Sequence, residues 1–95
     1  MATTDQHVTK DPDAVLDYGF DWSAWLTTSG NDTIATSTWI VDAGLVKGIT
    51  GNTTTTTTVW LSGGTSGTTY KAVNRIVTTG GRTNDRTLYV AVTDL

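Results

Sequence analysis

The fold class follows from residues 58–92, which read TVWLSGGTSGTTYKAVNRIVTTGGRTNDRTLYVAV. Three segments rich in β-branched residues alternate between apolar and polar positions, and glycine-rich stretches at 62–68 and 80–81 separate them. Such alternation is typical of half-buried strands, and short glycine-rich intervals between alternating runs are typical of tight turns. We therefore predict three consecutive strands, the last of which directs Leu88, Val90 and Val92 into a core.

The rest of the chain repeats this pattern, with turn signals every eight to twelve residues or so, as in a β-sandwich. Strands are expected around Leu16 to Phe20, over 33–41 with Trp39 in the core, and over 53–61, with a short edge strand at best over 45–49. Tyr70 stands where immunoglobulin-like folds often place a corner tyrosine. The prediction is an all-β, immunoglobulin-like sandwich of about seven strands.

One short helical turn is expected within this sandwich. Asp21 is a favoured helix N-cap, and Trp22, Trp25 and Leu26 follow at helical spacing. The sequence thus predicts a turn of helix near Asp21 to Leu26.

The 95 residues are expected to form one domain with an extension. Residues 1–12 have no hydrophobic period, contain the single histidine, His7, and end at the only proline, Pro12. We interpret them as an extended N-terminal arm, mobile in isolation or laid against a partner. Residues 13–95 are the predicted sandwich domain.

Composition argues against several classes of partner. The net charge is −3, which disfavours nucleic acid, and no apolar run approaches the length of a membrane span. The N-terminus shows no export signal, so synthesis in the cytoplasm is expected. The charge is uneven, at −5 over residues 1–47 (seven Asp, two Lys) and +2 over 48–95 (one Lys, three Arg, two Asp). Solvent-exposed loops and strand faces account for this uneven charge. The alternative is a contact in which the acidic patch of one copy meets the basic patch of a neighbouring copy.

Reactive side chains are too few for an active site. The chain has one His, no Cys and no Glu, and a nucleophile–histidine–acid triad would have to recruit His7 from the arm. The series Asp11, Asp13, Asp17 and Asp21 lacks the glycine and terminal glutamate of a calcium loop, and the glycines at 63–67 precede a strand rather than a phosphate-binding helix. We expect no enzyme activity, no cofactor, no metal site and no small-molecule substrate.

Tryptophan and arginine mark the candidate partner-binding residues, because both are enriched at protein interfaces. The candidates are Trp22, Trp25, Trp60, Arg75, Arg82 and Arg86. For Trp22 and Trp25, packing within the domain is favoured over docking. Trp60 should point outward, either beneath the N-terminal segment or toward a partner, and glycan binding through exposed tryptophans is a further alternative.

An ordered set of short motifs carries a family resemblance. It comprises DPD at 11–13, VLDY at 15–18, DWSAWL at 21–26, DTI at 32–34, STW at 37–39, VWLSGG at 59–64, TTY at 68–70, NRI at 74–76 and RT at 82–83. Together they resemble phage fiber-tail adaptor proteins, small virion proteins of tailed phages and prophages.

That resemblance implies an immunoglobulin-like structural module that joins a fiber to the tail or neck. Its expected partners are other virion proteins, such as tail, neck or fiber subunits, with multiple copies per particle. Its expected location is the virion, after synthesis in the bacterial host cytoplasm. Alternatives are a capsid or neck decoration protein and an adhesion module that binds host-surface glycans.

Overall fold

The computed structural model describes residues 6–94 of the chain. In this part the elements are β1 (Gln6–Lys10), β2 (Leu16–Asp21), α1 (Ser23–Thr28), β3 (Ile34–Val41), β4 (Leu45–Asn52), β5 (Thr56–Gly63), β6 (Thr69–Thr78) and β7 (Thr83–Val92). The prediction of an all-β fold with one short helix is confirmed.

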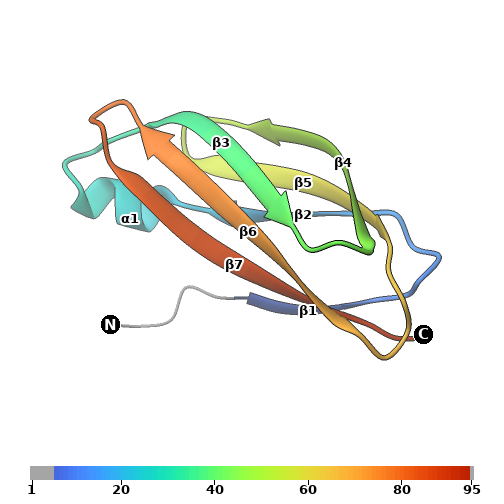
Figure 1. Ribbon diagram of the computed structural model, residues 1–95. Helices are drawn as coiled ribbons and strands as arrows, with labels where there is room; N and C mark the ends of the chain where they lie inside the picture. The colour runs from blue at the N-terminus through green and yellow to red at the C-terminus, as the bar shows by residue number, and fades with distance from the viewer. Residues whose placement is uncertain (1–5, 95) are drawn as a thin grey trace.

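The strands form two sheets that face each other as two layers, with α1 at one end (Figure 1). One sheet has the order β1-β7-β6-β3, and the other has the order β2-β5-β4. All pairings are antiparallel except that of β1 with β7, which is parallel. The finer immunoglobulin-like assignment stays a prediction, with which this strand order is compatible.

The core lies between the two sheets and is built by alternate residues of each strand. Val59 and Leu61 of β5 meet Leu88, Val90 and Val92 of β7 in one buried cluster, as predicted. The same cluster includes Phe20 and Trp39, whose rings stack at 5.7 Å between centroids. Because strand side chains alternate between faces, the residues between these positions form the outer surfaces.

Tyr70 ties the β5–β6 connection to the start of β6. Its hydroxyl accepts a hydrogen bond of 2.9 Å from the Thr65 N–H, five residues upstream, and its ring is buried. The bond from Thr65 holds the pKa of the Tyr70 hydroxyl below its ordinary value. This is the contact that defines a tyrosine corner, in agreement with the prediction from its position.

The structure departs from the prediction of an arm in one respect. Gln6–Lys10, within the expected arm, is the edge strand β1, with Val8 directed toward the core and Lys10 fully buried. The Lys10 ammonium donates hydrogen bonds to the carbonyls of Gly63 (2.8 Å) and Asp11 (2.9 Å), so the strand is tied to the sandwich by a polar anchor rather than by an apolar stripe. Residues 1–5 of the predicted arm lie outside the described residues.

Three boundaries also differ from those predicted. The helix α1 begins at Ser23, and Asp21 precedes it, accepting a 2.9 Å hydrogen bond from the Ser23 N–H. The strand β4 continues to Asn52 rather than ending near residue 49, because pairing with β5 holds it although seven of its eight residues are exposed. The strand β5 begins at Thr56, since the Thr53 hydroxyl accepts the Thr55 and Thr56 N–H groups in a turn.

Candidate docking surfaces

The structure separates the six predicted partner-binding residues into three groups. Trp22, Trp25 and Arg86 come together at the α1 end, Arg75 and Arg82 lie on or beside the β6–β7 hairpin, and Trp60 lies on the other sheet. They therefore do not form one continuous site. Each group has a different capacity to contact a partner.

Trp22 is a core residue and not a docking residue in this conformation. Its side chain has 0% exposure, and its indole Nε1 donates a 3.0 Å hydrogen bond to the Asn74 Oδ1. The half-buried Trp25 packs its ring edge-on against Trp22 at 5.7 Å between centroids. Of the two, only Trp25 has exposed surface in this conformation, and their roles in partner binding stay predictions.

Arg86 covers Trp22 instead of extending from the hairpin. Its guanidinium carbon lies 4.1 Å from the centre of the Trp22 ring, a cation–π geometry, and its Nη1 donates a 2.8 Å hydrogen bond to the Asp21 carbonyl. Burial lowers the pKa of Arg86, while the Asp21 carboxylate opposes that shift. The contact with Trp22 joins residues 64 positions apart, from β7 to the residue that follows β2.

Arg75 is held in a bidentate ion pair on the outer face of β6. Its Nε and Nη2 donate to the two carboxylate oxygens of Asp85 at 2.9 and 3.0 Å. Strand register, and not nearness in the sequence, makes this pair, because it places Asp85 directly opposite Arg75. The hydrogen bonds to Asp85 raise the pKa of Arg75, and both side chains remain substantially exposed.

Arg82 is paired with a carboxylate that organises the hairpin end. Its Nη1 lies 3.0 Å from Asp32, whose carboxylate also accepts hydrogen bonds from the Thr79 hydroxyl and the Gly80 N–H. A hydrogen bond with the Thr78 side chain, followed by those from Thr33, Thr79 and Gly80, holds the pKa of Asp32 far below its ordinary value. The Arg82 guanidinium is half exposed and thus still presents donors to solvent.

Trp60 is the centre of an exposed apolar surface on the outside of the β2-β5-β4 sheet. Its side chain is 42% exposed, and Val46 and Ile49 of the neighbouring β4 are 55% and 78% exposed. A β-bulge in β4 brings Gly48 and Ile49 opposite Trp60, and a Cβ on Gly48 would stand 3.4 Å from the Trp60 Cβ. We call Val46, Ile49 and Trp60 the Trp60 patch.

The described N-terminal residues do not cover this patch. Trp60 points outward as predicted, where either the N-terminal segment or a partner was expected to cover it. Residues 6–10 do not cover it, because β1 pairs with β7 in the opposite sheet. The polar neighbour of Trp60 across the strands is Asp17 of β2. An apolar patch with a polar rim is typical of an interaction surface.

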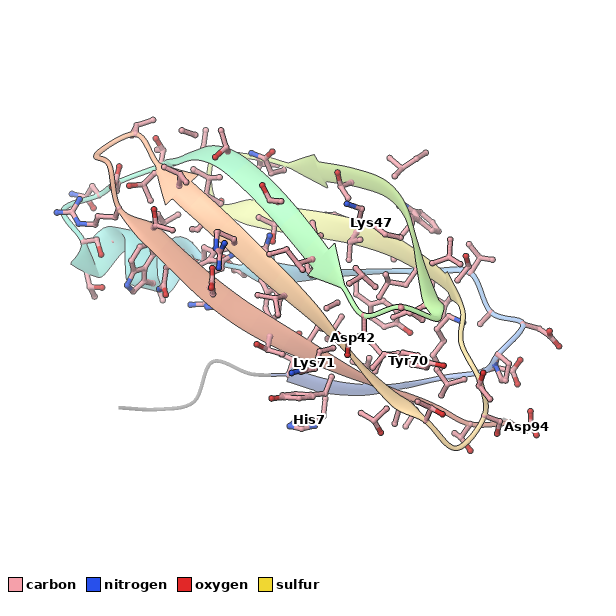
Figure 2. All side chains as sticks on the ribbon, viewed as in Figure 1. His7, Asp42, Lys47, Tyr70, Lys71 and Asp94 are labelled. Atoms are coloured by element: carbon pink, nitrogen blue, oxygen red, sulfur yellow. The ribbon has the colours of Figure 1, made fainter. Side chains whose placement is uncertain are left out.

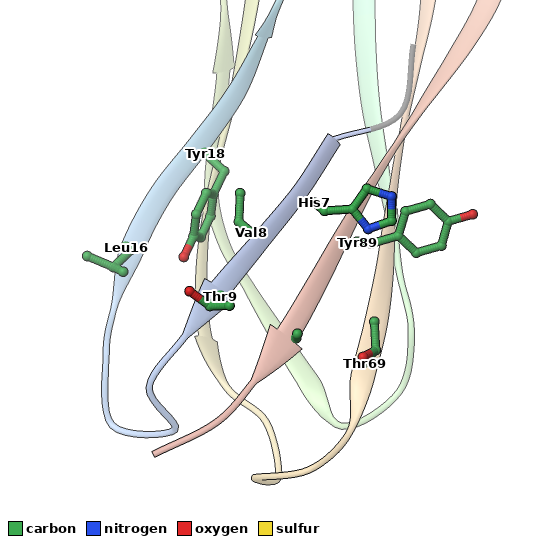
Figure 3. Close-up of a pocket in the computed structure, with 8 residues that line it drawn as sticks. His7, Val8, Thr9, Leu16, Tyr18, Thr69 and Tyr89 are labelled. Atoms are coloured by element: carbon green, nitrogen blue, oxygen red, sulfur yellow. The ribbon is translucent and has the colours of Figure 1, made fainter. Parts of the chain in front are cut away.

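A groove of about 650 Å³ runs along the edge where β1 and β2 approach each other. Figure 3 shows Val8 and Tyr18 side by side between these strands, with the His7 ring beside that of Tyr89; these two rings stack at 4.7 Å. Burial raises the pKa of Tyr18, whose hydroxyl has no hydrogen-bond partner among the described residues. Sequence reasoning missed this groove because it placed His7 in an arm.

The described residues offer little for chemistry. Among residues 6–94, no group of three or more His, Cys, Asp or Glu side chains is placed to hold a metal ion. The groove lining pairs one histidine with threonine, tyrosine and aliphatic side chains and has no acid. No helix in this part of the chain has the length and apolar character needed to cross a membrane.

Comparison with a family of known proteins supports the motif resemblance. A search of curated proteins finds none that matches the sequence. A family model described as podophage GP4 fiber-tail adaptor protein gp77 matches residues 10–91, from the last residue of β1 to the penultimate residue of β7. This match covers most of the 95 residues and agrees with the motif resemblance, so the chain belongs to the podophage GP4 fiber-tail adaptor protein gp77 family.

Proposed function

We propose that this protein joins a fiber to the tail or neck of a phage particle and that it docks through the Trp60 patch. Family membership indicates a structural role in the virion and a non-enzymatic one. The single observation that carries the choice of surface is the 42% exposure of Trp60 beside Val46 and Ile49. Its partners are other virion proteins, and it is present in multiple copies per particle.

The physical case for the patch rests on the cost of leaving it in water. Each square ångström of apolar surface removed from water contributes about 25 cal/mol, and tryptophans at the centre of an interface commonly cost about 2 kcal/mol or more when truncated. The patch lies on strands β4 and β5, whose pairing fixes the backbone before binding. Little ordering entropy is then lost on docking.

A link requires a second surface, and the α1 end supplies one on a different side of the molecule. Helix α1 and the β6–β7 connection both lie at the end of the sandwich opposite the β1–β2 loop (Figure 1). The helix carries the half-buried Trp25, and the connection carries the half-exposed Arg82. Arginine and tryptophan are both typical of interface centres. We assign one partner to the Trp60 patch and the other to this end.

The test is incorporation into particles. In a phage that lacks the gene, Trp60→Ala supplied in trans should enter purified particles at least tenfold less than wild type, as quantified by mass spectrometry. The matched control is Val15→Ala, which trims an apolar residue of the β1–β2 loop that is more exposed than Trp60 (60% against 42%). Both variants should keep the wild-type melting temperature, since neither side chain is in the core.

Other outcomes would assign other functions. Wild-type incorporation of a folded Trp60→Ala protein would remove the patch from the docking surface. Quenching of tryptophan fluorescence by host saccharides would instead support glycan binding. Cryo-EM of particles that places the chain on the capsid or neck, away from any fiber, would support a decoration role.

A further inference from the structure

The outer face of the β1-β7-β6-β3 sheet is a second broad surface, and it is not part of the docking surfaces assigned above. Along β6 the outward residues are Lys71, Val73, Arg75 and Val77. Val77 and, on the neighbouring β3, Ile40 are exposed apolar residues. Among the described residues no element covers this face, because the other sheet packs on its inner side (Figure 1).

Strand register arranges the polar residues of this face in rows. In one row, the Asp42 carboxylate accepts a 2.9 Å hydrogen bond from the Lys71 N–H, Lys71 lies opposite Tyr89, and Tyr89 lies opposite His7. Figure 2 shows Asp42, Lys71 and His7 in this order across the sheet.

The next rows follow the same register on β6 and β7. Val73 lies opposite Thr87, and Arg75 lies opposite Asp85, with which it forms the bidentate pair. A cation on β6 is therefore matched by an aromatic ring or an acid on β7 in each charged row.

This arrangement is self-complementary about one axis. Consider a second copy that packs its outer face on this one, related by a two-fold axis that runs parallel to the strands, midway between β6 and β7. This axis places β6 of one copy over β7 of the other, so each β6 residue faces, in the second copy, the β7 residue with which it pairs in its own sheet. Arg75 would then meet the second copy's Asp85, Lys71 would meet its Tyr89, and Asp42 would meet its His7. A two-fold contact is isologous, so each of these pairs forms twice.

Other simple axes bring like charges together. An axis along β6 would set Lys71 against the second copy's Lys71, and an axis across the strands at Val73 would set Lys71 against its Arg75. Like charges placed opposite each other at an interface are unfavourable by several kcal/mol or so. Charge complementarity therefore selects the axis between β6 and β7.

The size of the face is sufficient for a specific contact. Strands of 5, 10, 10 and 8 residues, spaced about 4.8 Å apart and rising about 3.3 Å per residue, give a projected face of roughly 500 Å². A surface covered by side chains exceeds its projection, and stable interfaces bury about 800 Å² from each partner. Sheets pack face to face about 10 Å apart when both carry side chains of this size.

We propose that two copies of this chain associate through the outer face of the β1-β7-β6-β3 sheet, about a two-fold axis between β6 and β7. The contact is independent of the adaptor proposal, because the Trp60 patch lies on the other sheet and stays free in the pair. Each pair would then display two Trp60 patches.

Reciprocal charge reversal tests the axis directly. In sedimentation velocity over a concentration series, the wild type should show a monomer–dimer equilibrium. Arg75→Asp alone and Asp85→Arg alone should each raise the dissociation constant at least tenfold, because each sets like charges opposite each other. An equimolar mixture of the two variants should dimerise again, since every Arg75 position of one variant then faces a complementary charge in the other.

Controls separate this face from the rest of the molecule. Val46→Asp, on the other sheet, should leave the dissociation constant unchanged, whereas Val73→Asp should raise it, and circular dichroism should show that all variants are folded. If a charge variant fails to fold, Val73→Cys mixed with Thr87→Cys provides a second readout, because the chain has no native cysteine. A short bismaleimide should crosslink that mixture faster than either variant mixed with Val46→Cys.

The proposal is overturned by any of four results: a wild type that stays monomeric at millimolar concentration, single reversals that dimerise like wild type, a mixture that does not recover dimers, or dissociation by Val46→Asp.

Discussion

Asn74 connects the two sheets through the core, and its removal should be among the most damaging changes in the molecule. Its side chain has 0% exposure and lies on β6. The Oδ1 accepts hydrogen bonds from the Trp22 Nε1 at 3.0 Å and from the Thr57 hydroxyl at 2.7 Å. The Nδ2 donates to the Ser37 hydroxyl at 2.9 Å and to the Thr38 carbonyl at 3.2 Å.

The magnitude of Asn74→Ala follows from the groups it leaves behind. The Trp22 indole N–H can only donate a hydrogen bond, and it is buried, as is the Thr57 hydroxyl. Each buried polar group left without a partner costs about 1–3 kcal/mol. Two such groups, with a small cavity, give an expected loss of about 4 kcal/mol in the free energy of unfolding.

That loss is large for a chain of this length. A 95-residue domain has a free energy of unfolding of about 5–14 kcal/mol. We therefore expect Asn74→Ala to lower the melting temperature by roughly 15 °C or more. The matched control is Asn84→Ala, which removes a surface amide that accepts the Asp85 N–H and should change stability by less than about 0.5 kcal/mol.

The assay is urea denaturation followed by tryptophan fluorescence and far-ultraviolet circular dichroism. The denaturant slope should stay constant, so that the midpoint alone reports stability. Thr57→Val in the Asn74→Ala background should cost less than in wild type, because its partner is already gone. A loss below about 1 kcal/mol for Asn74→Ala, or full additivity with Thr57→Val, would refute the account of Asn74 as a stabilising connection between the sheets.

Substitutions at two further positions test other parts of the structure. The folded-state pKa of Asp32 lies below its unfolded value, so its contribution to stability is present above about pH 4 and is lost as the pH falls below that. Asp32→Asn should therefore weaken the loss of stability of the wild type between about pH 4 and pH 2 in thermal unfolding; an unchanged pH profile would contradict this. In urea denaturation, Lys10→Met should lower the free energy of unfolding by less than about 1.5 kcal/mol, because it removes a buried charge together with its two carbonyl contacts. Lys10→Ala should lower it by about 3 kcal/mol, because it leaves a cavity. Equal losses for the two variants would contradict this.

The strands of the C-terminal half were predictable because buried apolar residues alternate there with polar or exposed ones, with a period of two. In β5 the core residues are Val59 and Leu61. In β7 they are Leu88, Val90 and Val92, as predicted. Tyr70 was predictable from its place at the start of a strand after a glycine-rich turn, and its bond to Thr65 bears this out.

The strand β1 was not predictable by the same rule. Its five residues contain one apolar side chain packed on the core, Val8, and its one fully buried residue is Lys10, a residue type that is rarely buried without a partner. The partners of Lys10 are backbone carbonyls 53 and 1 residues away, which carry no signal in composition. Only tertiary structure reveals that this lysine can be inside.

The docking candidates were predictable only as residue types. Trp60 could be placed outside from its alternation with Val59 and Leu61, and it is exposed. Trp22 shares the inward parity of Phe20 and is buried, but the guanidinium above it comes from β7, 64 residues away. Arginines that look alike in sequence thus take different roles, as a cover for Trp22 and as surface ion pairs.

Asn74 and Lys10 together explain how a small sandwich without cysteine joins its layers. Immunoglobulin domains of antibodies join their two sheets by a disulfide. Here Asn74 of β6 bonds to Thr57 of β5 in the opposite sheet, and Lys10 of β1 bonds to the Gly63 carbonyl at the end of that same strand. The two contacts stand near opposite ends of β5 and clamp it against the other layer. Because these connections are internal, both outer faces remain free for docking.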